Sequence, residues 1–451
     1  MMKRVFFLAL IIFLSACTEK LDIKPDQSLN VPETVADFQA MLDNVEVING
    51  FIPSYGEAGS DNYYITDTRY NGLAANSDRN TYIWAKDIFP VNYVAADWVY
   101  GYVRVNYCNL VLEGLEHVST GIGAAAYNNV KGSALFFRAF SFYTLAGEFC
   151  KPYDSTAAAT DPGIPLRTKS DVQIIYQRAS VKATYEQVLA DLAMAAELLP
   201  DIATVKTRPS KAAVYGLLAR IHISLKNYQE ALEYANLSLA IYHKLLDYNT
   251  IDPGSSLPFD MFNDDVLFFA KLTPTSLLRM SSAIVDSMLY KQYQDNDLRK
   301  SIFFRDGPGG IKLFKGTYSG NSLFHFGGIG VDEMYINRAE CYVRLGDVAH
   351  AMEDLNTLLR TRWKSGTYTD MTAVDADDAL EKILTERRKE LLFRGLRWVD
   401  LRRLNKDPRF AKTLTRMVKG SVYQLPPNDV RYVYPIPEDE VRLSGIEQNA
   451  R

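Results

Sequence analysis

Histidine and cysteine are scarce in this chain of 451 residues, which holds five of the first and four of the second. Zinc sites in proteins are built mainly from these two residue types, so we expect no metal site of that kind. The formal net charge is −4, whereas affinity for nucleic acid draws on an excess of positive charge. The composition therefore argues against a metal cofactor and against nucleic acid as a partner.

Motifs that carry chemistry are also missing. The sequence contains no His-Glu-x-x-His pattern, no Gly-x-Ser-x-Gly turn and no phosphate-binding loop of the Walker type. Asp264 with Asp265, or Glu438 with Glu440, could in principle serve a glycosidase. Adjacent acids without a partner elsewhere are more often solvated turn residues, so we predict a protein that is not an enzyme and that uses no cofactor.

The first seventeen residues indicate the compartment. Lys3 and Arg4 precede an uncharged apolar stretch over 5–16, which is too short to cross a bilayer but suits the apolar region of a secretory signal peptide. A buried N-terminal strand is the alternative. The stretch ends in Leu-Ser-Ala followed by Cys17, which resembles a bacterial lipobox. We therefore expect residues 1–16 to be a signal peptide and Cys17 to carry diacylglycerol and palmitate-type acyl chains that hold the protein on a membrane.

The three remaining cysteines are Cys108, Cys150 and Cys341. An odd number spread over more than two hundred residues does not make a disulfide framework, and at most one pair could form. Each lies in an apolar helical context, where a small buried thiol is the more common role.

Helical periodicity dominates the rest of the chain. Apolar residues three and four apart, beginning at Trp98, predict a helix with that tryptophan in the core. Thr184 to Gln187 is typical of a capping box at the start of a second helix that Pro200 closes. Ser210 is expected to cap a third helix, and Gly395 to stop a fourth that carries Leu380, Ile383, Leu384, Leu391 and Leu392. The sequence thus predicts an all-α fold with few and short strands.

An internal repeat appears when the chain is compared with itself at an offset of 120 residues. The matched positions are Ala219 with Ala339, Leu225 with Leu345, Asn227 with Asp347, Ala231 with Ala351, Glu233 with Glu353 and Asn236 with Asn356. Each copy reads as helix, turn, helix, which resembles a tetratricopeptide unit. Such hairpins bury their apolar faces by stacking on neighbours, and the scaffolds they form bind partners.

Two stretches differ from this pattern, namely 50–96 and 251–330. They combine aromatic rings with Gly, Asn, Asp and Ser, and we expect long surface excursions there. Rings beside amide and carboxylate groups suit a sugar-binding surface, although any single tyrosine is more often a side chain that pins its loop to the body. We take Trp84 as the best candidate for an exposed platform. The other candidate ligand contacts are Tyr82, Tyr93, Tyr63, Tyr64, Arg69, Asp61 and Asn62.

The segment 386–403 carries seven basic residues and three acids around Phe393 and Trp398. Glu386, Glu390 and Asp400 are placed to pair with arginines along helices. We therefore expect an internal ion network that clamps the last helices.

This same segment, from Glu386-Arg387-Arg388 to Leu401-Arg402-Arg403, closely resembles the C-terminal signature of the SusD/RagB family of outer-membrane lipoproteins from Bacteroidetes. Further landmarks of that family are matched in order along nearly the whole chain. They are Leu21-Asp22 with Pro25, 98–109, Arg138-Ala139-Phe140, 163–166, 208–211, Asp297-Leu298-Arg299, 333–356, Pro435-Ile436-Pro437 and Gln448-Asn449.

The resemblance implies one helical SusD-like domain over 17–451, with an N-terminal part to about 230, a C-terminal part from about 231, and four tetratricopeptide-like hairpins. It further implies a lipoprotein on the outer face of the outer membrane that captures an oligosaccharide and delivers it to a SusC-like TonB-dependent transporter. Two alternatives stay open. The protein could act mainly as a structural lid that gates the transporter, or it could bind another nutrient such as peptides.

Overall fold

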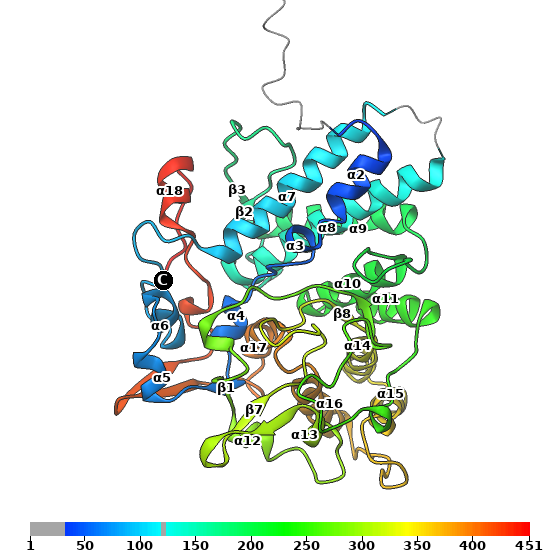
Figure 1. The fold of residues 1–451 in the computed structure, drawn as a ribbon, viewed down its shortest axis with the longest axis vertical. Helices are drawn as coiled ribbons and strands as arrows, with labels where there is room; N and C mark the ends of the chain where they lie inside the picture. Colours follow the sequence, from blue (N-terminus) through cyan, green and yellow to red (C-terminus); the bar gives the residue numbers. More distant parts are fainter. Residues whose placement is uncertain (1–31, 119–122) are drawn as a thin grey trace, which may run out of the picture.

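A computed structural model describes residues 32–118 and 123–451 of the chain (Figure 1). The expected signal peptide and Cys17 lie outside the described residues. Within them the long helices are α7 (Ala96–Leu115), α8 (Ala124–Phe149), α9 (Val181–Leu198), α10 (Lys211–Ser224), α11 (Tyr228–Ile241), α14 (Val331–Arg344), α15 (Val348–Arg360) and α16 (Ala376–Glu390). The expected all-α class with short strands is confirmed.

The shorter helices connect and flank these long ones. They are α2 (Val35–Leu42), α3 (Val45–Ile48), α4 (Tyr55–Gly59), α5 (Asp67–Asn71), α6 (Asn76–Tyr82), α12 (Ser287–Tyr290), α13 (Arg299–Ile302), α17 (Arg397–Leu404) and α18 (Glu438–Ser444). Single 3-10 turns occur at η1 (Tyr248–Thr250), η2 (Ser276–Leu278), η3 (Pro308–Gly310) and η4 (Val430–Tyr432).

The strands lie in four small antiparallel sheets. The largest has the order β1-β5-β7-β6, with β1 (Tyr63–Tyr64), β5 (Ile284–Val285), β7 (Lys312–Phe314) and β6 (Phe304–Asp306). The other pairs are β2 (Pro162–Pro165) with β3 (Arg178–Ser180), β4 (Val266–Phe268) with β8 (Ile329–Gly330), and β9 (Leu414–Val418) with β10 (Ser421–Leu425).

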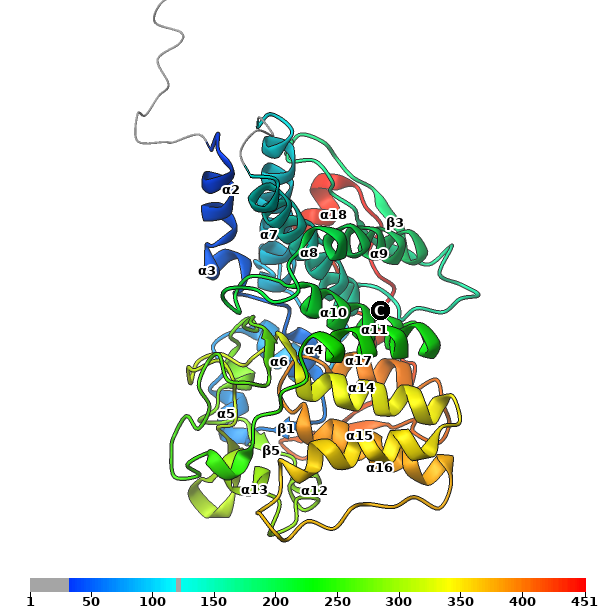
Figure 2. The ribbon, with the colours of Figure 1, turned by 90° about the vertical axis from the view of Figure 1, so that its right-hand side faces the viewer.

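The predicted repeat is present as two matching helical hairpins. α10 and α14 begin 120 residues apart, and so do α11 and α15. Both turns contain a residue with positive φ, Lys226 at 62° and Gly346 at 90°. Ala231 and Ala351 are fully buried, because the two helices of each hairpin approach closely there. Figure 2 shows the hairpins stacked below α8 and α9.

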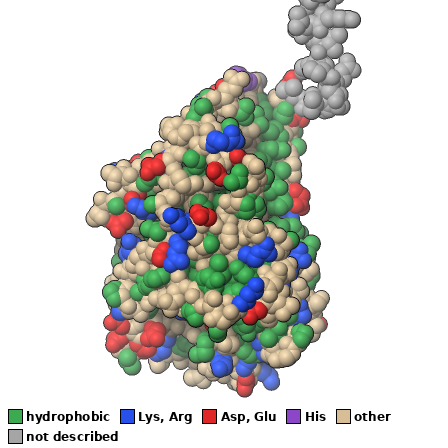
Figure 3. Space-filling model, turned by 90° about the vertical axis from the view of Figure 1, so that its left-hand side faces the viewer, with side chains coloured by type: hydrophobic (Ala, Val, Ile, Leu, Met, Phe, Trp, Pro, Cys, Tyr) green, Lys and Arg blue, Asp and Glu red, His purple; other side chains and the backbone are tan. Residues whose placement is uncertain are grey.

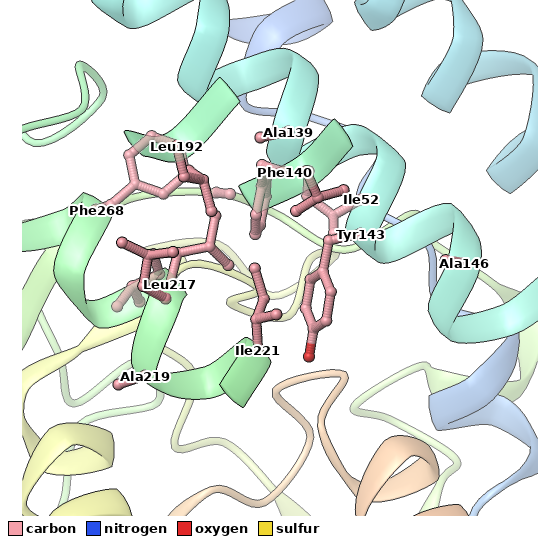
Figure 4. Packing of buried hydrophobic residues seen from close by; sticks show 14 of the residues in the cluster. Ile52, Ala139, Phe140, Tyr143, Ala146, Leu192, Leu217, Ala219, Ile221 and Phe268 are labelled. Carbon is pink, nitrogen blue, oxygen red and sulfur yellow. The ribbon is translucent and has the colours of Figure 1, made fainter. Parts of the chain in front are cut away.

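The main core lies where α8, α9 and α10 meet β4. Phe140 packs edge-on against Phe268 with ring centroids 5.7 Å apart, and Leu192, Leu217 and Ile221 close the cluster (Figure 4). Trp98 is buried in the same core, as the helical pattern predicted. The three cysteines are buried free thiols, which confirms the packing role proposed for them.

Two helix boundaries differ from expectation. Ser210 caps α10 as predicted, but α9 begins at Val181 with Ser180 as its cap, so the capping box at Thr184 is wrong. Strand β3 runs directly into α9, and the helix therefore starts before Thr184. α16 ends at Glu390, and the chain then reverses through Phe393 and Gly395, both with positive φ.

The predicted ion network over 386–403 is confirmed and extends further than expected. Asp400 binds Arg387 and Arg403, at 2.7 and 2.8 Å. Glu386 and Glu390 instead bind Arg299, at 2.6 and 2.9 Å, and Glu390 also binds Arg362. The network thus ties the end of α16 to α13 and to the residues after α15.

Candidate ligand-binding face

The two excursions, 50–96 and 251–330, form one layer. Strand β1 of the first pairs with β5 of the second, and β5 pairs in turn with β7. Many of their apolar side chains, among them Tyr63, Tyr82, Val285 and Phe314, form a second core that Phe393 and other residues from outside the excursions complete. The excursions are therefore a packed module, which differs from the expected surface loops.

Three of the predicted ligand-contacting rings are buried, Tyr63 and Tyr82 in this second core and Trp84 at the edge of the main core. The rings of Tyr63, Tyr82 and Trp84 surround the guanidinium of Arg416 from strand β9, at 5.2, 4.1 and 4.7 Å from their centroids. Arg416 also donates to the carbonyl oxygens of Tyr82, Ala58 and Ser60. The rings therefore hold the first excursion against the C-terminal hairpin through cation–π contacts.

The expectation of an exposed platform at Trp84 is wrong, since its side chain is only 2% exposed. Trp84 follows α6 with a φ of 53°, a conformation that costs a bulky residue free energy. Its indole nitrogen donates to the carbonyl of Gly59 at 2.9 Å. Burial of the ring and this hydrogen bond offset the backbone strain, so Trp84 serves packing.

Asp61 and Asn62 belong to an ion cluster at the edge of the module. Asp61 binds Arg397 at 2.7 Å and Lys412 at 2.8 Å, and it also pairs with Arg388. Although burial alone would raise its pKa, these cations hold the pKa of Asp61 well below its usual range. Asn62 is buried and donates to Glu57. Both side chains therefore have protein partners that position the start of β1.

Glu57 is buried away from solvent beside Asn62. Its carboxylate accepts hydrogen bonds from Asn62 at 2.8 Å and from the backbone N–H of Gly395 at 3.1 Å. Burial nevertheless raises its pKa to about 7.

Tyr93, another predicted ring of the excursion 50–96, stacks on Phe89 with ring centroids 5.4 Å apart and is half-buried.

Two predicted residues stay accessible, Tyr64 and Arg69. Tyr64 is 39% exposed because alternate residues of a strand point to opposite faces and Tyr63 points inward. Arg69 donates from Nη2 to the carbonyl of Ser276 at 2.8 Å, and its Nε has no partner among the described residues. We use the name α5–η2 face for the exposed Tyr64 at the end of β1 together with the cluster that begins three residues later in α5, namely Arg69, Tyr70, Asp78 and Ser276.

Asp78, Ser276 and the exposed Arg279 had no signal in the sequence. Thr275 donates to Asp78 at 3.4 Å, and Arg69 and Arg279 both lower the pKa of Asp78, which burial raises. These groups meet because the two excursions cross, with about two hundred residues between them. Contacts between segments so far apart in the sequence cannot be predicted from composition or residue spacing.

Three buried carboxylates, Asp265, Asp332 and Glu390, lie within 4.8 Å of one another. Such a group can hold a cation. Here Arg362 binds Asp265 at 2.8 Å and Glu390 at 2.7 Å, and Arg394 binds Asp332 at 2.7 Å. The arginines already supply the positive charge, so the cluster is accounted for as part of the ion network.

No described helix is long and apolar enough to cross a membrane. Stacked hairpins that carry a separate loop-built face are the architecture of a binding scaffold.

Comparisons with known proteins agree with this class. A family model described as "Starch-binding associating with outer membrane" matches residues 19–223, and the SusD family model matches 332–450. A tetratricopeptide repeat model matches 212–242, which covers the first hairpin of the repeat. This chain belongs to the SusD family.

Among curated relatives, SusD-like protein P2 of Formosa agariphila is 27% identical over 248 residues, which cover 51% of this chain and 45% of that protein. SusD-like protein P38 of the same organism is 40% identical over 79 residues, 16% of each chain. The matched region thus spans less than half the length of either relative.

Solved structures show the same fold. A SusD superfamily protein from Bacteroides thetaiotaomicron superposes with a TM-score of 0.76 at 20% identity, covering 93% of this chain and 100% of that one. A structure described as a laminarin-binding SusD-like protein gives a TM-score of 0.66 at 20% identity, covering 92% and 98%.

Proposed function

We propose that this protein captures an oligosaccharide on the outer face of the outer membrane and delivers it to a SusC-like TonB-dependent transporter. The observation that carries the proposal is the α5–η2 face, where the exposed ring of Tyr64 is followed within a few residues by Arg69, which contacts a backbone carbonyl and lies near the acid Asp78. A sugar ring stacks on such an aromatic face, and its hydroxyls bond the polar groups beside it. The starch-binding description of the family and the laminarin-binding relative support a glycan as the ligand.

Calorimetry of the chain without residues 1–17, against a panel of neutral and acidic oligosaccharides, tests this proposal. We expect Tyr64→Ala and Arg69→Ala each to weaken binding of the cognate sugar about tenfold, the equivalent of ~1.4 kcal/mol. Tyr100→Ala is the matched control, because Tyr100 is 37% exposed on α7 and lies outside this face. Unchanged affinity in both face variants would remove the assignment.

A structural lid with little affinity of its own is the second candidate function. The burial of Trp84, Tyr82 and Tyr63 favours it, because it leaves few rings to hold a ligand. A chain that co-purifies with a barrel transporter yet binds no sugar or peptide in isolation would establish the lid and overturn glycan capture.

The lipid anchor is tested separately. Cys17→Ser should give an unlipidated protein that leaves the membrane fraction, and its persistence there after a salt wash would count against acylation at Cys17.

A further inference from the structure

A second groove lies apart from the α5–η2 face, on the outer side of α7. It has a volume of about 340 Å³ and lies between α7, the loop joining β2 to β3, and α18. We call it the α7 groove. Figure 1 places α18, α6 and α5 along the same side of the molecule, the side that faces the viewer in Figure 3, where hydrophobic patches alternate with charged groups of both signs.

The floor of the groove is a helical stripe. Val99, Val103 and Tyr107 are four residues apart on α7 and line it, with Tyr102 and Asn106 beside them. The ring of Tyr102 already contacts Trp98 and is covered by Arg167 at 5.4 Å. Tyr107 is half-buried, packs on one side against the main core and lines the groove.

The wall is held in place by hydrogen bonds to α7. The Asn109 amide donates to the carbonyls of Arg167 at 2.9 Å and Lys169 at 3.1 Å. The backbone N–H of Ser170 donates to Glu113 at 3.1 Å. Because Asn109 and Glu113, on adjacent turns of α7, fix the loop by hydrogen bonds, the groove exists before any ligand arrives, and binding loses little free energy in ordering it.

Polar groups line the same groove as Tyr107. Arg167 binds Glu440 of α18 at 3.1 Å through Nη2, while its buried Nε has no partner among the described residues. The side chains of Asn106 and Lys169 also line the groove. An unpartnered buried donor costs free energy unless a ligand or water satisfies it.

We propose that the α7 groove is a second saccharide-binding site, which holds a sugar ring against Tyr107 while Asn106, Arg167 and Lys169 bond its oxygens. The inference rests on the proposed glycan-binding function and places a second contact on the same side of the molecule. Its volume lies at the small end of the 300–1,000 Å³ typical of ligand sites, which suits one or two sugar units. An apolar peptide side chain would leave the Arg167 donor unsatisfied. A protein with two saccharide-binding sites would bind long oligosaccharides, which can occupy both sites, more tightly than short ones.

The test uses 5-fluorotryptophan and fluorine NMR on the full mature chain. Trp98 lines the groove, whereas Trp84, Trp363 and Trp398 do not, so its resonance reports the groove alone. We titrate laminarihexaose, maltohexaose, xylohexaose, an oligogalacturonate and an apolar tripeptide. We expect at least one saccharide to shift the Trp98 resonance saturably, both in the wild type and in Tyr64→Ala.

Groove variants give the second arm of the experiment. Tyr107→Ala should abolish the Trp98 shift, and Lys169→Ala, an exposed position that does not endanger folding, should weaken it at least threefold. Tyr100→Ala, on the same helix but outside the groove, should leave the shift unchanged. A shift that survives Tyr107→Ala and Lys169→Ala would overturn the site.

The outcomes separate the two proposals. A silent Trp98 resonance while calorimetry detects sugar binding overturns the groove and leaves the proposed function intact. A Trp98 shift combined with calorimetry that is insensitive to both Tyr64→Ala and Arg69→Ala supports the groove and overturns the α5–η2 face. A shift with the tripeptide alone overturns the saccharide assignment, and the absence of any sugar response in both measurements overturns both sites.

Discussion

Two regions of this protein bury arginine in opposite ways. Below the stacked hairpins, Arg362 has no exposed surface and is neutralised by Asp265 and Glu390. Where β9 meets the first excursion, Arg416 is also buried, at 5% exposed, but has no carboxylate partner within the described residues. Three carbonyls and three aromatic rings surround it instead.

The two regions are stabilised by different interactions, ion pairs around Arg362 and neutral hydrogen-bond acceptors and aromatic rings around Arg416. In the ion network every charge depends on a partner from another element, and the loss of one member leaves an opposite charge stranded in a dry interior. Around Arg416 the partners are neutral, so loss of the cation strands only hydrogen-bond acceptors. Replacing a buried arginine is therefore expected to lower the free energy of unfolding by different amounts in the two regions.

The largest effect is expected from Arg362→Met. This change strands Asp265 and leaves Glu390 with Arg299 as its cation, and breaking a buried pair in this way costs about 3–5 kcal/mol of unfolding free energy. Urea unfolding followed by circular dichroism measures it. Arg360→Met is the control, because Arg360 and its partner Asp370 are both about half-exposed, and exposed pairs contribute below about 1 kcal/mol. Equal losses of unfolding free energy in the two variants would show that the buried ion network stabilises the fold no more than an exposed ion pair does.

Arg416→Met should cost less, about 2 kcal/mol, because methionine refills the space among the rings while the three carbonyls lose their donors. We also expect the fluorescence of Trp84 to change, since its ring lies 4.7 Å from the guanidinium. If this variant proves less stable than Arg362→Met, the contrast drawn between charged and neutral partners does not hold.

A buried acid pair without any arginine sharpens the comparison further. Asp97 accepts from the backbone N–H groups of Ser54 and Tyr55, and Glu148 accepts from that of Gly56 at 2.8 Å. The second oxygen of each carboxyl has no other partner. Burial raises the pKa of Asp97 to about 6, and burial and the adjacent Asp97 charge raise that of Glu148 well above its usual value. Both groups therefore keep their protons to a higher pH than exposed carboxyl groups do.

Glu148→Gln should change the pH dependence of stability by a smaller amount. With its folded pKa above the unfolded value of 4.5, Glu148 binds more proton in the folded state, so wild-type stability falls as pH rises above that value. The permanently neutral glutamine removes this loss, by at most about 1.4 kcal/mol per pH unit. Urea midpoints from pH 5 to 8 should diverge in favour of the variant, whereas exposed Glu353→Gln should follow the wild type. A constant offset at every pH would contradict the raised pKa of Glu148.

The sequence was sufficient to predict features that repeat or that follow helical spacing. Ala231 and Ala351 marked the two hairpins, and Trp98 followed a helical face into the core. Glu386 and Glu390 were correctly expected to pair with arginines, but the partners Arg299 and Arg362 could not be named. They lie on other elements, and only the packed fold brings them near.

Trp84 shows the other kind of failure. An aromatic ring among glycines and asparagines has the same local sequence whether it covers a surface or fills a core. The residue that decides is Arg416, more than three hundred positions later. Thr184 was assigned as a cap because the local pattern fits, but strand β3 begins the helix earlier. Local chemistry predicted elements, whereas long-range contacts decided which side chains remained accessible.

The second excursion is inserted between two hairpins that pack directly on each other. α11 ends at Ile241 and α14 begins at Val331, yet the two helices are neighbours, and the Tyr335 hydroxyl donates to the carbonyl of His243 across their junction. The insert therefore leaves and returns at one place. Because the entropy of closing a loop grows only with the logarithm of its length, the loops of this stretch can be lengthened while β4 stays in the main core and the stack stays intact. If the proposed function holds, the ligand can change through these loops while the helical frame is kept.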